Sequence, residues 1–300
     1  MRNNYYWFNF FRLYLVRTWV HLFLGKITIL NKEKMPVGKP MIVVMNHQNS
    51  FLDAFVVVTK FPMFAHFMTN AMVFKNPIIG GFLRSLNLIP IYRRRDGIRS
   101  VEKNKEIFEL TSGYLKRGDQ IFIFPEANHN LKRRLRPISK GFSRMIFGTM
   151  EKYDWDLDLQ VVPVTVNYGD HRNSMQPVRV VIRDPIPVKK YEKIYKEDER
   201  EAPVKIKEDV HDALIEHLVH VPNADDYPAY YIILDELAND DTEITDPYLS
   251  NKRIAWLEER LTEDDLEAGR DMLKILERHH IRLKFAEQKN TWLQWIGFVA

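Results

Sequence analysis

His47 and Asp53 are the residues whose types and spacing point most directly to chemistry in this chain. An imidazole can remove a proton near neutral pH, and a carboxylate that accepts a hydrogen bond from the ring fixes its tautomer and stabilises its protonated form. Both residues lie in the segment Asn-His-Gln-Asn-Ser-Phe-Leu-Asp at 46–53. The pair therefore predicts a general base with an orienting partner. The plainer alternative is turn chemistry, in which Asn49 or Ser50 caps a helix.

Two apolar runs on either side of His47 predict the elements that would position it. Residues 40–45 (Pro-Met-Ile-Val-Val-Met) have the composition of a short buried strand, and the apolar residues 51–59 could open a helix. His47 would then lie in the turn at the carboxyl end of a strand, where open α/β sheets hold their ligands. A second short strand is expected over 120–124, followed by the turn-rich segment 125–130 and a cluster of basic residues.

Four short blocks stand in order along the chain: N-H-x-x-S-x-x-D at 46–53, I-P-I-Y-R at 89–93, F-P-E at 124–126 and V-V-P-V at 161–164. Together they resemble the glycerolipid acyltransferase family, whose members acylate glycerol phosphate and lysophosphatidic acid. The resemblance covers about residues 36–187, roughly half of the chain. Four blocks in the family's order are more specific than any one block alone.

The resemblance implies a role for each matching residue. His47 would be the general base and Asp53 its partner. The other matches would bind substrates or shape the site: Arg93 for a phosphate group, Phe124, Pro125 and Glu126 for the acceptor, Pro163 near the acyl chain, Lys140 and Gly141 as the counterpart of the family's K-x-G, and Pro77 to Gly80 as its P-x-x-G. No cofactor is implied, because acyl-CoA or acyl carrier protein would enter as the acyl-donor substrate.

The chain departs from the family's pattern at several positions. Five residues instead of four separate His47 from Asp53, so the turn must accommodate an extra residue. Ala127 follows the F-P-E block where the family has a glycine, and the Ala-Met pair at 71–72 replaces its Lys-Glu. Asn87 replaces the glycine before the second block, a milder change because asparagine tolerates similar turns. These departures keep a non-catalytic lipid-binding or scaffold protein open as an alternative.

Composition and charge narrow the class of partner. The chain has 300 residues, 45% of them hydrophobic, which suffices for one large core and a smaller region. The lack of cysteine excludes a thiol nucleophile, disulfides and thiolate metal sites, and the ten histidines show no zinc-like spacing. Residues 1–190 carry 30 Lys and Arg against 14 Asp and Glu, whereas residues 191–300 carry 14 against 26. The basic half holds all four blocks and favours a phosphorylated lipid with an acyl-CoA, or an anionic membrane surface. Nucleic acid is not expected, because no nucleic-acid-binding motif accompanies the charge.

The amino-terminal segment favours a membrane surface. Residues 5–24 are mostly apolar and rich in Tyr, Trp and Phe, but Arg12 and Arg17 lie near the middle and make a bilayer-spanning helix costly. An interfacial helix fits better, with aromatic rings at the level of the lipid headgroups and both arginines reaching toward phosphates. A helix buried in the protein's own core is the alternative.

The expected architecture is an α/β fold with a mixed sheet flanked by helices. We expect a membrane-associated helical segment at 1–34, an acyltransferase domain at 35–190 and a helical region at 191–300, where apolar residues recur at three- and four-residue steps. The predicted reaction transfers a fatty acyl group to a hydroxyl of a lysophospholipid or glycerol phosphate acceptor, at the cytoplasmic face of a membrane, with His47 as the base. A lipid hydrolase with Ser50 as nucleophile is a second alternative, although Ser50 lacks a G-x-S-x-G turn.

Overall fold

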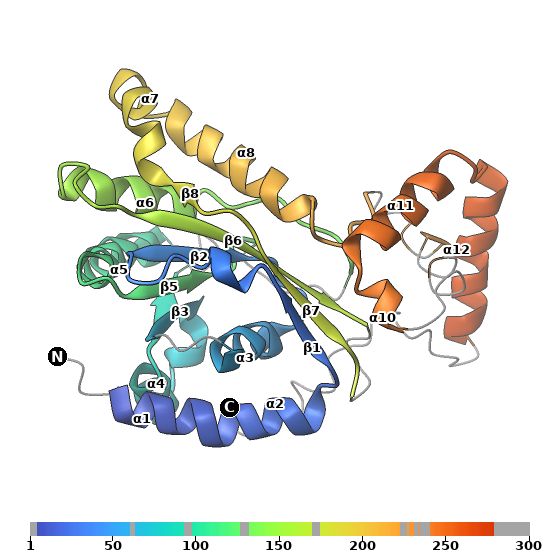
Figure 1. The fold of residues 1–300 in the computed structure, drawn as a ribbon, viewed down its shortest axis with the longest axis horizontal. Coiled ribbons are helices and arrows are strands. Elements are labelled where there is room, and N and C mark those ends of the chain that lie inside the picture. The colour runs from blue at the N-terminus through green and yellow to red at the C-terminus, as the bar shows by residue number, and fades with distance from the viewer. Residues whose placement is uncertain are drawn as a thin grey trace.

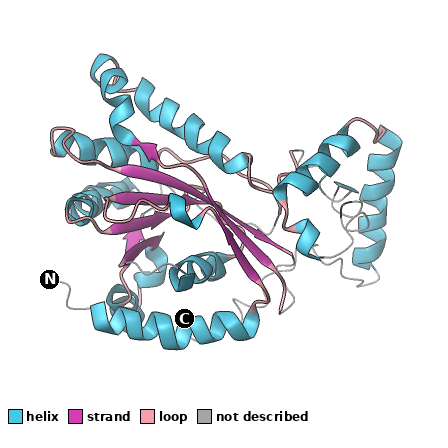
Figure 2. Ribbon diagram, viewed as in Figure 1, coloured by secondary structure: helices cyan, strands magenta, loops and turns pink. Residues whose placement is uncertain are grey.

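A computed structural model describes residues 5–60, 64–92, 98–126, 132–169, 175–222, 227, 229, 230, 234 and 241–278. One mixed sheet lies between two layers of helices, and the last described helices form a group to one side (Figure 1). Figure 2 shows the sheet enclosed by helices above and below. The prediction of a mixed sheet flanked by helices is confirmed. Among the described residues, no helix has both the length and the apolar character needed to cross a bilayer.

Eight strands of the described chain form the sheet, in the spatial order β1-β7-β6-β2-β5-β3-β4, with β8 paired to β6 beside this path. Their bounds are β1 Ile27–Leu30, β2 Met41–Met45, β3 Ala65–Asn70, β4 Leu88–Ile91, β5 Gln120–Ile123, β6 Gln160–Tyr168, β7 Val178–Ile182 and β8 Ile186–Pro187. Strands β6, β2, β5, β3 and β4 run parallel, whereas β7 is antiparallel to β6 and β1 follows the direction of β7. The carboxyl ends of the five parallel strands therefore meet at one edge of the sheet.

The two central strands, β2 and β6, are buried along their whole length. A continuous apolar run such as Met-Ile-Val-Val-Met is typical of a strand covered on both faces. Because successive side chains point to opposite faces, Ile42 and Val44 enter one core while Met41 and Val43 enter the other. The sheet is thus held between two apolar cores, and its carboxyl edge is held in place with it.

The helices on one face of the sheet are α5 Ile98–Lys116, α6 Gly141–Lys152, η5 Val188–Tyr191, α7 Glu192–Glu197 and α8 Glu201–Ile215. Helix α8 buries a stripe of residues at four-residue steps in the same core as Ile42: Ala202, Ile206, Val210 and Leu214. Helix α8, which lies in the predicted helical region 191–300, therefore covers the sheet. Residues 191–215 share the core of the α/β unit.

The other face is covered by α3 Ser50–Lys60, η3 Ala71–Phe74, α4 Pro77–Ser85 and a long amino-terminal helix that runs below α3 in Figure 1. This amino-terminal helix comprises α1 Tyr5–Phe10, a π-helical stretch η1 Phe11–Val16 and α2 Arg17–Phe23. The short η2 Lys32–Lys34 then joins β1 to β2. Strand β1 pairs with β7, so the predicted segment 1–34 contributes a strand to the sheet as well as a helix.

Arg12 departs from the sequence prediction. Its side chain is buried and donates hydrogen bonds to Asn9 Oδ1 (2.8 and 3.2 Å) and to the Val58 carbonyl (3.3 Å). The expectation that both arginines of this helix reach outward is wrong for Arg12, because the carbonyl groups near the end of α3 attract its charge. Arg17 is exposed.

The last described helices are α10 Asp241–Ile244, α11 Pro247–Glu258 and α12 Glu263–Arg278. They enclose a separate apolar cluster that also takes in residues from the end of α8 onward: Val219, Val221, Tyr227, Tyr230, Leu234, Ile244, Ile254 and Leu257. Gly269 of α12 lies so close to Ala229 that a Cβ at this glycine would stand 2.4 Å from the Ala229 Cβ. The contact explains why this position of α12 has no side chain.

Candidate active site

Asn46 fixes the point at which the chain leaves β2. Its side chain accepts a hydrogen bond from the Val166 N–H (2.7 Å) and donates one to the Val166 carbonyl (3.0 Å). These two bonds extend the pairing of β2 with β6 by a side chain, beyond the last backbone pair, Met45 with Val164. The next residue, His47, is then held in the turn that leads into α3, as the apolar runs predicted.

His47 and Asp53 are in contact despite the five residues between them. His47 Nδ1 lies 2.9 Å from Asp53 Oδ2, and the Asn49 N–H donates to the same oxygen (2.9 Å). Asp53 is completely buried, whereas 16% of the His47 side chain is exposed. Since an ionised carboxylate only accepts hydrogen bonds, Nδ1 carries the proton and Nε2 has the lone pair. The turn accommodates the extra residue and directs the Asn49 N–H toward the Asp53 carboxylate.

Tyr168 completes the surroundings of the Asp53 carboxylate. Its hydroxyl donates to Asp53 Oδ1 (2.7 Å) from the end of β6, 115 residues away in sequence. Burial, and then the neighbouring Asp53 charge, raises the pKa of Tyr168 well above its usual value, so the hydroxyl keeps its proton. Sequence reasoning missed this residue. The only signal was its place at the end of a strand that neighbours β2.

Glu126 holds the backbone of His47. Its Oε1 accepts the His47 N–H (2.8 Å), and its Oε2 accepts the backbone N–H (3.2 Å) and the Nε–H (3.1 Å) of Arg136. Burial raises the pKa of Glu126, and the hydrogen bonds from His47 and Arg136 oppose that rise. The carboxylate therefore braces the turn. Binding of the acceptor by Glu126 stays a prediction.

The rest of the F-P-E block also lies against the dyad. The ring of Phe124 stacks on the His47 imidazole, with centroids 4.1 Å apart and planes 19° from parallel. The Pro125 carbonyl accepts the Ser139 N–H (2.9 Å), which returns the chain to the site just before α6 begins. The side chain of Lys140 is exposed at this return. The structure thus brings the F-P-E block to the dyad, and Lys140 and Gly141 to the F-P-E turn.

Pro163 and the P-x-x-G segment have local structural reasons for their residue types. Pro163 lies opposite Val44, in the gap between the pairing of β6 with β8, which ends at Val161, and with β7, which begins at Val164. A residue without an N–H is tolerated at such a gap. Pro163 lies within the sheet, so its contact with an acyl chain stays a prediction.

In α4, Pro77 follows the capping residue Asn76, whose side chain accepts the N–H groups of the next turn at 2.9 and 3.2 Å. A Cβ at Gly80 would stand 2.9 Å from the Phe74 carbonyl oxygen. In the turn before β4, Asn87 adopts a φ of 62°, the left-handed conformation that asparagine tolerates. This is the kind of turn expected at the position where the family has a glycine.

Arg93 and Ala127 lie outside the described residues. The residue before Arg93 is Tyr92, whose N–H and carbonyl both bond the Asn104 side chain, at 3.0 and 2.8 Å. Strand β4 ends at the same edge of the sheet as β2, three strand spacings away, which is about 14 Å. Phosphate binding by Arg93 stays a prediction.

Several known proteins are similar to this chain. Residues 26–167, which include the dyad, Glu126 and Pro163, match the family model described as Acyltransferase. The chain is 27% identical over 195 residues to a chloroplastic 1-acyl-sn-glycerol-3-phosphate acyltransferase of Brassica napus, and 28% identical over 195 residues to one of Arabidopsis thaliana. Each match covers 59% of this chain, and 50% or 49% of the relative, so the chain spans about half the length of these relatives. The crystal structure of the 1-acyl-sn-glycerophosphate (LPA) acyltransferase PlsC from Thermotoga maritima aligns with a TM-score of 0.46 and 18% identity, over 71% of this chain and 83% of that one.

Proposed function

Because residues 26–167 match the acyltransferase family model, we propose that the protein transfers a fatty acyl group from acyl-CoA or acyl carrier protein to a hydroxyl of a lysophosphatidic acid, another lysophospholipid or glycerol phosphate. The observation that carries the proposal is the His47–Asp53 contact of 2.9 Å at the carboxyl edge of the sheet. The relatives in Brassica and Arabidopsis are named as 1-acyl-sn-glycerol-3-phosphate acyltransferases, which supports a phosphate-bearing acceptor.

In the proposed reaction His47 Nε2 removes the proton of the acceptor hydroxyl, and the oxygen attacks the carbonyl carbon of the thioester. The C–S bond then breaks, and the leaving thiolate takes the proton from the imidazolium, so the base is regenerated. Asp53 stabilises the imidazolium through the Nδ1–H bond. The acyl group passes directly to the acceptor, without an acyl-enzyme.

The phosphate group of the acceptor would bind Arg93. Arg93 matches the phosphate-binding arginine of the second block, and the strand before it ends at the same edge as β2. A guanidinium can hold a phosphate with two parallel hydrogen bonds, which also fixes the orientation of the acceptor. We therefore assign Arg93 to the acceptor's phosphate and the His47 side of the edge to its hydroxyl.

Two alternatives remain, and the geometry supports neither as well. The five-residue spacing favours a scaffold protein, yet the His47–Asp53 contact forms, and hydrogen bonds from Asn49 and Tyr168 support the Asp53 carboxylate. A hydrolase would use Ser50, the first residue of α3. Asp53 already orients the His47 imidazole for general base catalysis, whereas Ser50 is accounted for by its place at the start of the helix.

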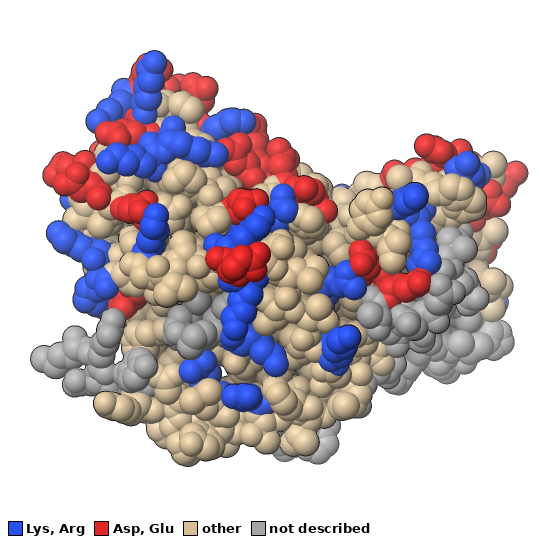
Figure 3. All heavy atoms as spheres, in the orientation of Figure 1, with Lys and Arg blue, Asp and Glu red and all other residues tan. Residues whose placement is uncertain are grey.

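We further propose that the protein works on a membrane surface through its amino-terminal helix. The buried residues on the inner face of this helix recur at four-residue steps: Phe8, Arg12, Val16, Val20 and, at its carboxyl-terminal end, Leu24. Its outer face is apolar too, with side chains 37% to 86% exposed: Tyr6, Trp7, Phe10, Leu13, Tyr14, Leu15 and Leu22. A contiguous exposed apolar face of this kind marks a contact surface. In Figure 3 the region over this helix is largely tan with scattered blue.

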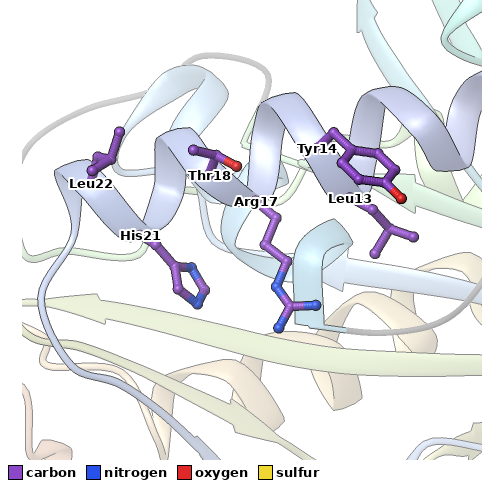
Figure 4. Close-up of a pocket in the computed structure, with 6 residues that line it drawn as sticks. All are labelled: Leu13, Tyr14, Arg17, Thr18, His21 and Leu22. Atoms are coloured by element: carbon purple, nitrogen blue, oxygen red, sulfur yellow. The ribbon is translucent and has the colours of Figure 1, made fainter.

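The outer face also offers cationic contact to lipid phosphates. A shallow groove on it is lined by Leu13, Tyr14, Arg17, Thr18, His21 and Leu22, and Figure 4 shows Leu13, Arg17 and His21 pointing to the same side of the helix. An interfacial helix buries such apolar side chains among the acyl chains while its cations stay at the phosphates.

Helix α4 extends this membrane surface. Ile78 and Phe82, one turn apart, are 82% and 45% exposed. Phe82 packs edge-on against Phe11 at 5.7 Å, and Trp7 Nε1 donates to the Ser85 hydroxyl (3.2 Å), so α4 is joined to the amino-terminal helix. Because η3 and α4 follow the carboxyl end of β3, the surface continues from the helix toward the edge that holds His47.

The direct test is to incubate the purified protein with labelled acyl-CoA and a panel of acceptors: lysophosphatidic acid, glycerol phosphate, an uncharged monoacylglycerol and an aminolipid. We expect labelled product with a phosphate-bearing acceptor and little with monoacylglycerol. Label that stays on the protein as an acyl-serine would favour the hydrolase. No product with any acceptor, with acyl carrier protein also tried as donor, would contradict the acyltransferase.

A further inference from the structure

The Asp53 carboxylate receives hydrogen bonds on both oxygens, and only one of them comes from the base. Oδ2 accepts His47 Nδ1–H and Asn49 N–H at 2.9 Å each, and Oδ1 accepts the Tyr168 hydroxyl at 2.7 Å. Asp53 and Tyr168 are both completely buried. A buried hydroxyl and a buried carboxylate are each costly without a partner, so the contact is a strongly held one.

We propose that Tyr168 is a positioning residue that sets the basicity of His47 through Asp53. The inference rests on the proposed function, in which His47 is the base. Its effect passes through the Asp53 carboxylate, to which both Tyr168 and His47 are hydrogen-bonded.

The physical reason is the division of one carboxylate charge among its donors. A hydroxyl bound to Oδ1 stabilises the carboxylate and so reduces the stabilisation that remains for a positive charge on the imidazole. Without the hydroxyl, the carboxylate attracts the imidazolium more strongly, and His47 holds its proton to a higher pH. If the poorly solvated carboxyl instead took up a proton itself, loss of activity would also begin at a higher pH. Both routes move the acid limb of the activity profile in the same direction.

Tyr168 is held rigidly enough to do this. It is the last residue of β6, and the next N–H, of Gly169, bonds the Pro177 carbonyl (2.9 Å). The Gly169 carbonyl accepts a hydrogen bond from the Arg133 guanidinium (2.8 Å), which is itself buried. The hydroxyl therefore has a fixed donor position, as a residue that adjusts charge through a hydrogen bond requires.

Two other charged groups near the dyad, Glu126 and Arg136, are paired with each other. Glu126 contacts the His47 backbone and forms an ion pair with Arg136, with Arg136 Nε 3.1 Å from Glu126 Oε2. The charged or titratable groups that contact the dyad or its immediate supports include Asp53, Tyr168, Glu126, Arg136 and Arg133. Of these, only Tyr168 donates to Asp53 Oδ1, so it is the residue to vary.

The experiment compares the full chain with Tyr168→Phe and follows the His47 ring by NMR over a pH titration, with His47→Ala used to assign its signals. We expect the midpoint of the imidazole titration to rise by about 0.5 to 1 pH unit, and the acid limb of kcat/KM to rise with it. The control is Tyr191→Phe, which removes another buried tyrosine hydroxyl, 2.6 Å from Asp209 and away from the dyad. It should leave the midpoint unchanged.

Replacement of Tyr168 by 3-fluorotyrosine gives the opposite sign with almost no change in volume. Its more acidic hydroxyl is the stronger donor, so the midpoint should fall. This second variant decides the question if Tyr168→Phe does not fold. An unmoved midpoint in the folded variants would overturn the proposal, and so would equal shifts in Tyr168→Phe and Tyr191→Phe. The ring titration needs no turnover, so a shifted midpoint in a protein that transfers no acyl group would refute the proposed function and not the coupling.

Discussion

His47 is restrained by three groups from two parts of the chain, α3 and the segment directly after β5. Asp53 of α3 bonds its Nδ1, Glu126 after β5 accepts its backbone N–H, and the Phe124 ring lies parallel to it. Each restraint removes a different motion: ring rotation, shift of the turn, and tilt of the plane. At the scale of the residue, the site is a base whose orientation is settled before a substrate arrives, which is what general base catalysis requires.

We expect Glu126→Gln to lower kcat/KM by about tenfold, because the amide provides one acceptor and one donor where two acceptors face the His47 N–H and Arg136. The substitution keeps the shape, so the loss should lie mainly in kcat, through a displaced His47. Steady-state kinetics on lysophosphatidic acid would measure it. The matched control is Glu258→Gln on the exposed face of α11, and equal kinetics for the two variants would exclude the bracing role.

Arg93→Lys should raise the KM for a phosphate-bearing acceptor by about tenfold with a smaller change in kcat, because an ammonium group cannot reproduce a bidentate guanidinium contact. Arg94→Lys is the control, since the neighbouring arginine carries the same charge in the same run. If both substitutions raise KM equally, the cluster supplies only a general positive field.

At the scale of the element, the amino-terminal helix is apolar on both faces for two different reasons. Its buried positions recur at a four-residue step over four turns, whereas an ideal α-helix would drift by about 40° at each such step. The π-helical stretch Phe11–Val16 widens the turn and keeps the stripe aligned on the core. The outer face is apolar as well, and no core of the described chain covers it.

The membrane contact is tested by substitutions on that outer face. Deletion of residues 5–24 would also remove Phe8, Val16, Val20 and Leu24 from the core, so a loss of binding would not separate docking from misfolding. We expect Leu22→Glu and Ile78→Glu each to weaken flotation with anionic vesicles several-fold, while turnover of a water-soluble short-chain acceptor stays near normal.

Val204→Glu is the control for this comparison. Val204 is 51% exposed on α8, in the helical layer on the opposite side of the sheet. If Val204→Glu weakens flotation as much as Leu22→Glu does, the added negative charge alone accounts for the effect. Unchanged flotation of both Leu22→Glu and Ile78→Glu would refute the docking surface.

At the scale of the whole molecule, the carboxyl-terminal helices are tied to the loop that supports the site. The Arg133 N–H bonds the Tyr227 hydroxyl (2.8 Å) and the Arg133 carbonyl accepts the Val221 N–H (2.8 Å). The Leu135 N–H donates to His220 Nδ1 (3.0 Å). The next residue along the loop is Arg136, which holds Glu126, so the two parts of the chain meet one residue from the support of the dyad.

This junction should weaken in acid. Burial, with smaller contributions from Arg134 and His211, lowers the pKa of His220 to about 4. A histidine whose pKa is depressed on folding stabilises the fold above its unfolded value, near 6.5, and loses that contribution as the pH falls toward 4. Protonation of Nδ1 would also set an N–H against the Leu135 N–H. The melting temperature should therefore fall between pH 6.5 and 4 by several degrees more than in His220→Gln, whose amide accepts the bond without titrating. The melting temperature of His211→Gln, at a half-exposed position, should fall as that of the natural protein does, and identical curves for all three would contradict the assignment.

Much of the fold follows from local patterns in the sequence. The buried strands at 41–45 and 120–123 and the helix after His47 follow from apolar runs and turns, because burial on both faces of a sheet leaves a continuous apolar signature. The His47–Asp53 contact could also be predicted, because the two residues lie only six positions apart across the turn from β2 into α3.

The parts that sequence reasoning missed depend on distant contacts. Tyr168 meets Asp53 across 115 residues, and Arg12 turns inward to Val58, 46 residues away. A long-range hydrogen bond leaves no periodicity in the sequence, so neither could be read from a local window. The apolar stripe of α8 likewise shows which face of the helix is buried, but it does not show which surface covers that face.

The central claim is that His47 is the base of an acyl transfer, and one measurement tests it most directly. Transfer of labelled acyl groups from acyl-CoA to lysophosphatidic acid is measured for the natural protein, for His47→Ala and for His211→Ala, a half-exposed histidine of α8. Circular dichroism and thermal unfolding confirm that each variant is folded. The account predicts that His47→Ala loses at least about a hundredfold in kcat, the least that general base catalysis contributes, while His211→Ala keeps its activity. A folded His47→Ala protein with near-normal turnover would contradict it.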